Sequence, residues 1–226
     1  MLKHTEMWIQ TAKLFKKHIL SKQQVKMSRA SFDKTAMLYN FLEKYIWEDY
    51  TVICEIIDEY LTFQPEEKII DVGGGTGLIA KVLRRKRQTD DIMVIDLSRS
   101  MLQKVKDFTL SVVQGDVITI PLRDETFTLA ILVNTIHHID ETKQEVVMRE
   151  VFRILKKQGR IFIIEISHPN TFFSNLFIKI EKMLVGKTHH LTADKMQLTI
   201  QEVGFHEIKV FSPKKYPHRY IITAVK

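Results

Sequence analysis

The sequence predicts an α/β fold, a mostly parallel sheet of seven strands with helices on both faces and a helical cap at the N-terminus. Short apolar, β-branched runs alternate with segments of helical periodicity from residue 64 onward, which predicts the sheet and its helices. Only a short loop with two prolines separates the last two runs, so this final pair should be antiparallel while the earlier strands run parallel. The stretch before residue 64 has a mostly helical pattern, which predicts the cap.

Seven strands are expected where apolar and β-branched side chains cluster. In chain order these runs are Lys68–Val72, Ile92–Asp96, Ser111–Gln114, Thr128–Val133, Arg160–Ser167, Glu207–Phe211 and Tyr220–Val225.

Four helices are expected between or after these strands. They are Leu78–Lys86, Arg99–Asp107, Thr142–Lys156 and Thr192–Val203. The third begins with a capping box, Thr142-Lys-Gln-Glu145. One face of it carries a buried stripe formed by Val147, Val151, Ile154 and Leu155. In the fourth, Thr192 is expected to cap the start and Gly204 to follow the end.

The length of 226 residues predicts one compact unit with two parts, a helical cap over residues 1–63 and the sheet over residues 64–226. The single cysteine, Cys54, excludes a disulfide framework and a cysteine-based metal cluster, so no metal site is expected. The N-terminus does not resemble a secretory leader, and no apolar run approaches the ~20 residues that span a bilayer. Together with the low cysteine content, this predicts a cytoplasmic protein.

Lysine and arginine outnumber aspartate and glutamate by 34 to 27, which gives a net charge of +7. The N-terminal segment has a basic amphipathic pattern, with one apolar helical face formed by Trp8, Ala12, Phe15 and Ile19. Two interpretations stay open: this helix covers the pocket, or it makes a peripheral membrane contact. The basic run Arg84–Arg87 ends a predicted helix, where cations complement the helix dipole, so no nucleic-acid partner is expected.

A glycine-rich loop, Asp71-Val-Gly-Gly-Gly-Thr-Gly77, follows the first predicted strand and opens the first helix of the sheet. Glycine allows left-handed backbone and lets a ligand approach closely, which predicts a nucleotide-like ligand at this position. Asp96 ends the second strand and can accept hydrogen bonds from both hydroxyls of a ribose. These features fit NAD and S-adenosylmethionine equally well. No tyrosine is followed by lysine four places later, which weighs against a short-chain dehydrogenase.

The later motifs make the sequence resemble the class I S-adenosylmethionine-dependent methyltransferases from about Ser31 to the C-terminus. The segments that carry the resemblance are Asp71–Gly77, Val94–Met101, Val113–Val117 with Ile120–Leu122, Asp124–Ala130 and Asn134–Ile139. Arg153–Ser167 and Phe32–Asn40 are more narrowly similar to the ubiquinone/menaquinone-biosynthesis methyltransferases, although Lys157 and Gln158 depart from the usual Pro-Gly-Gly of that family. The resemblance implies a Rossmann-like sheet and S-adenosylmethionine as cofactor.

The resemblance also implies a set of cofactor-binding residues, namely Asp71, Gly73, Gly75, Thr76, Gly77, Asp96, Leu97, Met101, Asp116, Val117 and Asn134. The glycine loop with Asp71 would hold the methionine portion, and Asp96 would bind the ribose. Leu97 and Met101 would pack on the adenine, whose edge would meet Asp116 and the N–H of Val117. Asn134 would lie near the active centre.

A general base would help if the acceptor must lose a proton, and histidine has a suitable pKa. His137 and His138 follow the fourth strand, and Glu165 and His168 lie at the end of the fifth, which should be its neighbour. We therefore expect a His137–Glu165 pair as a candidate base with its orienting carboxylate. The alternative is that His137 and His138 begin a helix, one packing inward and one facing solvent.

The predicted function is methyl transfer from S-adenosylmethionine to a small organic acceptor, quinone-like or another secondary metabolite. An NAD-dependent oxidoreductase and a non-catalytic binding protein of the same fold stay open as alternatives. A flat apolar acceptor is favoured by aromatic residues in the variable segments, namely Trp8, Phe32, Tyr39, Trp47, Phe172, Phe173 and Phe177. The sequence makes no prediction of the oligomeric state.

Overall fold

The computed structural model describes residues 50–64, 66–87, 91–105, 110–166, 188–216 and 219–226. The predictions made for the N-terminal amphipathic helix, for His168 and for the aromatic residues of the variable segments fall outside this part of the chain.

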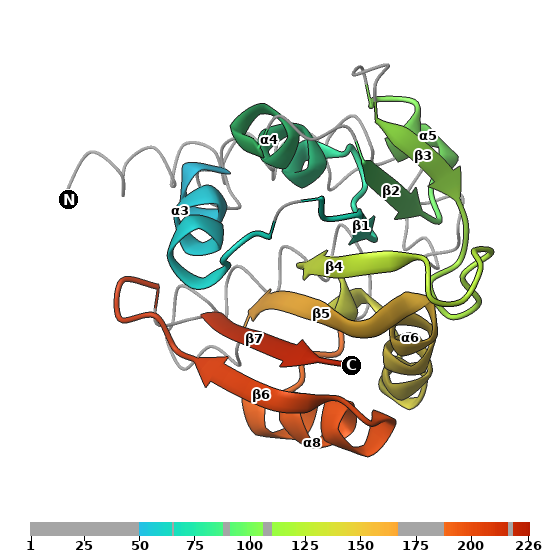
Figure 1. Cartoon of the computed structure of the whole chain (residues 1–226). Coiled ribbons are helices and arrows are strands. Elements are labelled where there is room, and N and C mark those ends of the chain that lie inside the picture. Colours follow the sequence, from blue (N-terminus) through green and yellow to red (C-terminus); the bar gives the residue numbers. More distant parts are fainter. Residues whose placement is uncertain (1–49, 65, 88–90, 106–109, 167–187, 217–218) are drawn as a thin grey trace, which may run out of the picture.

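A single seven-stranded sheet forms the centre of the molecule, with strand order β3-β2-β1-β4-β5-β7-β6 (Figure 1). Its strands are β1 (Ile69–Val72), β2 (Ile92–Asp96), β3 (Ser111–Gln114), β4 (Phe127–Val133), β5 (Leu155–Ile166), β6 (His206–Phe211) and β7 (Arg219–Val225). The first five pair in parallel, whereas β7 is antiparallel to both of its neighbours, β5 and β6. This confirms the predicted sheet, including the antiparallel final pair.

Helices cover both faces of the sheet, as predicted (Figure 1). The described helices are α3 (Tyr50–Tyr60), α4 (Leu78–Arg87), α5 (Arg99–Leu102), the 3-10 turn η1 (Ile136–His138), α6 (Glu141–Ile154) and α8 (Ala193–Val203). On one face, side chains of α3 and α4 form a buried cluster with alternate residues of the strands. On the other face, α6 and α8 pack against the remaining set.

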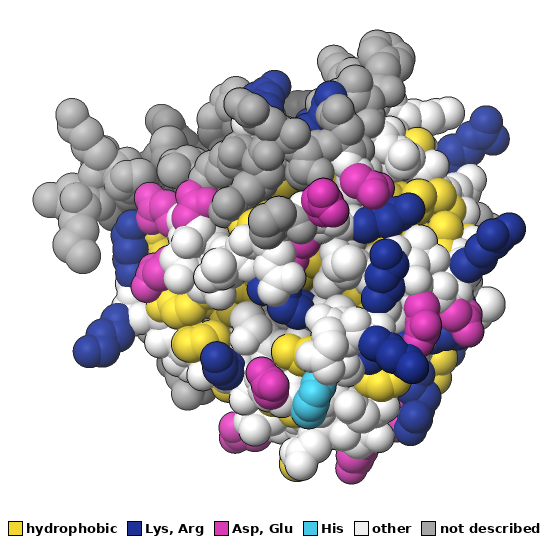
Figure 2. Space-filling view, viewed as in Figure 1, with side chains coloured by type: hydrophobic (Ala, Val, Ile, Leu, Met, Phe, Trp, Pro, Cys, Tyr) yellow, Lys and Arg dark blue, Asp and Glu magenta, His cyan; other side chains and the backbone are white. Residues whose placement is uncertain are grey.

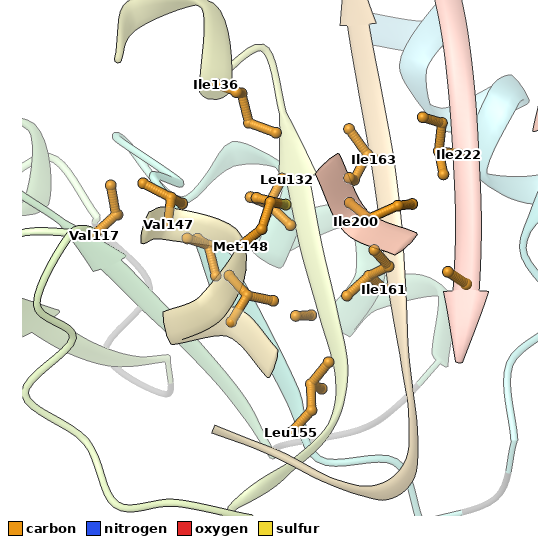
Figure 3. Packing of buried hydrophobic residues seen from close by; sticks show 14 of the residues in the cluster. Val117, Leu132, Ile136, Val147, Met148, Leu155, Ile161, Ile163, Ile200 and Ile222 are labelled. Atoms are coloured by element: carbon orange, nitrogen blue, oxygen red, sulfur yellow. The ribbon is translucent and has the colours of Figure 1, made fainter. Parts of the chain in front are cut away.

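The central strands are buried on both faces, which explains why they are continuous apolar runs. In β4, Leu129 and Ile131 belong to the α3/α4 cluster, while Ala130 and Leu132 belong to the α6/α8 cluster. Figure 3 shows Val147 and Met148 of α6 facing this second set of strand residues. The predicted stripe of the third helix, Val147, Val151, Ile154 and Leu155, is fully buried.

Two helix boundaries differ from the prediction. The N-cap of α6 is Asp140 rather than Thr142, because the Asp140 carboxylate accepts hydrogen bonds from the N–H and the hydroxyl of Thr142. The same helix ends at Ile154, because Leu155 already pairs with Phe127 as part of β5.

The helix predicted at Arg99–Asp107 also ends early, at Leu102. The backbone N–H groups of Lys104 and Val105 bond to carbonyls three residues back, so the chain tightens into turns there. The prediction for the last helix is confirmed, because Thr192 caps α8 and Gly204 follows it in left-handed conformation at φ 115°.

No helix in the described ranges is long and apolar enough to cross a membrane. On the face drawn in Figure 2, lysine and arginine side chains are scattered among aspartate and glutamate rather than gathered in one patch.

Candidate active site

The glycine loop joins the end of β1 to the start of α4 at the carboxyl edge of the parallel strands. The N–H groups of Gly73 and Gly74 donate to the Ile95 carbonyl of β2 at 2.8 and 3.2 Å, and Gly77 N–H donates to the Gly74 carbonyl. Gly73, Gly75 and Gly77 all have positive φ, at 71°, 53° and 68°. Left-handed backbone at three positions within five residues explains why this loop needs glycine.

The loop glycines differ in what surrounds them. A Cβ atom on Gly73 would lie 2.3 Å from Cγ2 of Thr135, and one on Gly74 would lie 2.4 Å from Oδ2 of Asp71. Among the described residues, a Cβ atom on Gly75 would meet only Oδ2 of Asp96, at 3.9 Å. Gly73 and Gly74 are therefore required by protein packing, whereas Gly75 has open space beside a carboxylate within the described part of the chain.

Two carboxylates, those of Asp96 and Asp71, lie beside the glycine loop. The half-buried Asp96 carboxylate accepts hydrogen bonds from Gly75 N–H at 2.9 Å and from Ser98 N–H at 2.8 Å. A carboxylate has about four lone-pair sites, so it accepts several hydrogen bonds at once. Asp71 is buried behind the loop, next to Gly74. Among the described residues, the space at Gly75 and the Asp96 carboxylate beside it fit an adenosyl ligand.

The other residues predicted to bind the cofactor differ in how far they are buried. Asp116 is half-buried and accepts from Ile118 N–H at 3.1 Å, in a turn that Thr119 N–H closes onto the Asp116 carbonyl. Leu97 is exposed, whereas Met101 and Val117 are buried. Thr76 is buried too, and its carbonyl accepts a hydrogen bond from Lys81.

Two side chains of α6 that were not singled out from the sequence anchor the segment after β3. Arg153 donates to the carbonyls of Ile120 and Leu122, each at 2.8 Å, and to the Asp124 carboxylate. Glu150 pairs with Arg153 and accepts from Ile120 N–H at 2.7 Å. On the sequence, these two residues are simply part of the polar face of a helix.

We expect Arg153→Ala to weaken binding of S-adenosylhomocysteine by about 3- to 10-fold, because the segment after Asp116 and Val117 loses its anchor while two carbonyls and two carboxylates lose a charged donor. Titration calorimetry measures the affinity. Arg149→Ala is the matched control, because Arg149 lies on the same helix but pairs only with the exposed Glu145 among the contacts described. Equal affinities of the two variants would contradict the anchoring role.

The segment after β4 makes hydrogen bonds both to the end of β1, next to the glycine loop, and to the start of β7. Asn134 has a positive φ of 53°, and its N–H donates to the Ile164 carbonyl. Thr135 donates through its hydroxyl to the Val72 carbonyl at 3.1 Å. The side-chain oxygen of Asn134 accepts from the guanidinium of Arg219, at the start of β7, at 2.8 Å. Local sequence patterns do not indicate this last contact, because 85 residues separate the two positions.

The structure brings His137 and Glu165 together, with Nδ1 of His137 2.6 Å from Oε2 of Glu165 and both residues 2% exposed. The other oxygen, Oε1, accepts from the N–H groups of Thr135 at 2.8 Å and Ile136 at 2.6 Å. Burial raises the pKa of the Glu165 carboxyl, but His137 and these two N–H groups outweigh it, so the pKa lies below its usual range. Glu165 is therefore a buried carboxylate that holds the turn after β4.

Residues of α6 and of the segment before α8 pack around the His137–Glu165 pair. The His137 ring stacks on His190, with centroids 4.9 Å apart, and the His189 N–H donates to the His137 carbonyl at 2.7 Å. The buried Gln144 of α6 donates to the carbonyls of Ile136, Ile139 and His189. Gln144 therefore joins the turn after β4 to the segment before α8. Among the described residues, no cluster of three or more metal-ligating side chains is placed to hold a metal ion.

The predicted site residues lie on two faces of the sheet. Because side chains alternate along a strand, Glu165 shares the α6/α8 face with Ile161 and Ile163. Asp71 follows the same rule and lies on the α3/α4 face with Ile69. The glycine loop and the His137–Glu165 pair are thus linked through the turn at Thr135. The catalytic role of His137 and Glu165 stays a prediction.

Comparison with known proteins identifies the family. A family model described as a methyltransferase domain matches residues 70–163. The demethylmenaquinone methyltransferase of Thermotoga maritima is 30% identical over 205 residues, which cover 86% of this chain and 78% of that protein. The chain belongs to the class I S-adenosylmethionine-dependent methyltransferases. Its methyl donor is therefore S-adenosylmethionine, which decides between the two cofactors that the glycine loop left open.

Other relatives of this methyltransferase agree in family and fold. The ubiquinone/menaquinone biosynthesis C-methyltransferase UbiE of Cronobacter sakazakii is 23% identical over 205 residues, covering 87% of this chain and 76% of that protein. A solved methyltransferase from Thermotoga maritima, described as a possible histamine N-methyltransferase, superposes with a TM-score of 0.72 at 21% identity, over 88% of this chain and 100% of that chain. The phosphoethanolamine N-methyltransferase 2 of Haemonchus contortus, solved with S-adenosyl-L-methionine, has a TM-score of 0.69 at 15% identity, over 89% of this chain and 60% of that chain.

Proposed function

We propose that this methyltransferase methylates a carbon or oxygen of a small, flat, hydroxylated ring of the quinol type. The supporting observation is the extent of the similarity to the Thermotoga demethylmenaquinone methyltransferase, which covers 86% of this chain and so extends beyond the matched residues 70–163. The solved neighbours named for amine acceptors reach only 21% and 15% identity and speak for the fold alone.

The donor supplies a methyl group already activated on a sulfonium, so the protein mainly has to position and shield the reactants. Orientation of this kind contributes roughly 7–11 kcal/mol in favourable model systems. In our proposal, Asp96 and the loop around Gly75 hold the donor, and Thr135 keeps the end of β4 against that loop.

The experiment supplies methyl-deuterated S-adenosylmethionine to the full chain under argon, with 1,4-naphthohydroquinone, histamine or phosphoethanolamine as acceptor. Mass spectrometry should find the deuterated methyl on the hydroquinone and on neither amine. Methylation of an amine, with none of the hydroquinone, would overturn the proposed acceptor class while leaving the methyltransferase family intact.

A variant of His137 tests the predicted base. If His137 removes a proton during transfer, His137→Ala lowers kcat by about 10²- to 10⁴-fold while leaving the affinity for S-adenosylhomocysteine unchanged. A pH–rate profile of the wild-type protein should then show a limb that the variant lacks. A fall in cofactor affinity at unchanged kcat would instead assign His137 to holding the turn next to the glycine loop.

Cytoplasmic location and a peripheral membrane contact of the predicted N-terminal helix stay predictions. Co-sedimentation of the full chain with anionic liposomes, compared with a chain lacking residues 1–28, tests the membrane contact. Equal and negligible binding of both chains would end that idea.

A further inference from the structure

The carboxyl ends of β1 and β4 lie where the strand order of the sheet reverses. From β1 the sheet continues to β2 and β3, whereas from β4 it continues to β5 and β7. The pairing between β1 and β4 stops at Asp71 and Ile131, while β1 stays paired with β2 for one residue more. Open parallel sheets bind ligands beyond the strand ends at such a reversal point. A residue that bridges these two strand ends therefore borders the proposed donor site.

Thr135 bridges the two strand ends through its side chain. Its hydroxyl donates to the Val72 carbonyl of β1 at 3.1 Å and to the Val133 carbonyl of β4 at 3.2 Å. The same peptide group that supplies the Val72 carbonyl supplies the N–H of Gly73, which donates to the Ile95 carbonyl of β2 at 2.8 Å. The peptide that enters the glycine loop is thus held from both neighbouring strands, and Thr135 provides the bond on the β4 side.

The Thr135 side chain also packs directly against Gly73. A Cβ atom on Gly73 would lie 2.3 Å from Cγ2 and 2.9 Å from Oγ1 of Thr135, which is closer than real Cβ atoms approach. Gly73 has a positive φ of 71°, so the chain changes direction at this residue. Thr135 therefore contacts the loop at the point where it turns away from β1.

The backbone of Thr135 is fixed as well. Its N–H donates to Oε1 of the buried Glu165 at 2.8 Å, next to the N–H of Ile136, and Thr135 itself is only 7% exposed. A side chain whose own backbone is held in this way keeps its hydroxyl in one place. Thr135 is therefore built to hold Gly73 in one orientation.

We propose that Thr135 is a positioning residue of the donor site, whose hydroxyl orients the Val72–Gly73 peptide so that the glycine loop binds the amino-acid end of S-adenosylmethionine. This inference rests on the donor site of the proposed function and deepens it, whichever acceptor is used. The amino-acid end carries an ammonium and a carboxylate, whose hydrogen bonds are strong and depend on geometry. In the proposed site the adenosine end lies beside Asp96 and Gly75, so its binding does not depend on Thr135.

The test compares two ligands that share the adenosine and the sulfur and differ in the amino-acid end, namely S-adenosylhomocysteine and methylthioadenosine. Each is titrated into the full chain in a calorimeter. The wild-type protein should prefer S-adenosylhomocysteine by at least ~10-fold, as expected for hydrogen bonds to charged groups. Thr135→Val keeps the shape of the side chain and removes its hydroxyl. This variant should bind S-adenosylhomocysteine about 3- to 10-fold more weakly and methylthioadenosine with unchanged affinity.

Thr128→Val is the matched control, because the Thr128 hydroxyl bridges the same two strands at their other end. It accepts from the Lys68 N–H at 2.9 Å and donates to the Lys68 carbonyl at 3.3 Å. This variant loses a comparable bond between β1 and β4 and should leave both affinities unchanged.

Thr135→Ser tests for rescue, because serine retains the hydroxyl that donates to the Val72 carbonyl. The serine variant should keep the wild-type preference for S-adenosylhomocysteine within about 2-fold. Loss of the preference in Thr135→Ser would overturn the role of the hydroxyl, even if the valine variant fails to fold.

The outcomes separate the inference from the proposed function. Equal weakening of both ligands in Thr135→Val, or an undiminished preference in that variant, overturns the role of Thr135 and leaves the donor site standing. Equal binding of both ligands by the wild-type protein overturns it too. If Gly75→Ala also leaves both affinities unchanged, the donor lies elsewhere, and the proposed donor site fails together with this inference.

Discussion

Glu165→Ala should lower the free energy of unfolding by about 3–5 kcal/mol at neutral pH, because it breaks a buried charged cluster from one side. The substitution leaves two backbone N–H groups, those of Thr135 and Ile136, and the His137 ring without their acceptor. For a chain of this size the melting temperature should fall by roughly 10 °C. Urea unfolding followed by circular dichroism measures the loss.

Glu145→Ala is the matched control for that loss. Glu145 is exposed and pairs only with Arg149 among the contacts described, so its removal should change stability by less than ~0.5 kcal/mol. Equal effects of the two substitutions would contradict the account of the turn after β4.

The Glu165 contribution should also depend on pH. Its pKa in the folded protein lies below the unfolded value of about 4.3, so the stabilisation is fully present above that value. It is lost as the pH falls through the folded pKa. The difference in unfolding free energy between the wild-type protein and Glu165→Gln should therefore shrink on acidification below about pH 4. A difference that stays constant down to pH 3 would mean that Glu165 is not ionised in the folded protein.

Gly75→Ala should weaken binding of S-adenosylhomocysteine by at least ~10-fold while costing only about 1–2 kcal/mol of stability. The added methyl group would enter the space beside Asp96, where it meets no other atom of the described residues within 4 Å but occupies the proposed donor site. Its stability cost comes from the positive φ of 53° alone. Calorimetric titration and urea unfolding measure the two quantities.

Two other glycines serve as references for this substitution. Gly73→Ala should cost about 3 kcal/mol or more, because its Cβ collides with Thr135 in addition to the backbone strain. Gly204 follows α8 at φ 115°, and an added Cβ there would lie 3.3 Å from Phe152, so Gly204→Ala should cost more stability than Gly75→Ala but leave ligand affinity unchanged. If Gly204→Ala and Gly75→Ala weaken binding equally, the space at Gly75 is not the donor site.

The sheet could be predicted from the sequence because its elements are set by local patterns. The strands Ile92–Asp96 and Ser111–Gln114 match their predicted bounds, since polar or glycine residues flank each apolar run. The first and last residues of α6 were harder to predict from the sequence. Asp140 and Thr142 are both good N-caps, and only the bonds made in three dimensions select Asp140. The end at Ile154 depends on pairing with Phe127, a contact that local periodicity does not encode.

The site residues that follow strand ends could be predicted from the sequence. The residues whose role depends on contacts between distant segments could not. Asp71, Asp96 and the glycines could be located because the carboxyl ends of parallel strands meet at one edge of the sheet. Arg153 and Arg219 carry no such signal, since each acts on a segment far away in the sequence. The proximity of His137 and Glu165 followed from the expected neighbouring strands, but the hold of Glu165 on two backbone N–H groups did not.

A crystal structure of the full chain with S-adenosylhomocysteine tests the proposed donor site most directly. The account predicts ribose hydroxyls within hydrogen-bond distance of the Asp96 carboxylate, the homocysteine portion along Gly73–Gly75, and the sulfur facing Asn134. A ribose bound away from Asp96, with the space at Gly75 left without ligand, would contradict it.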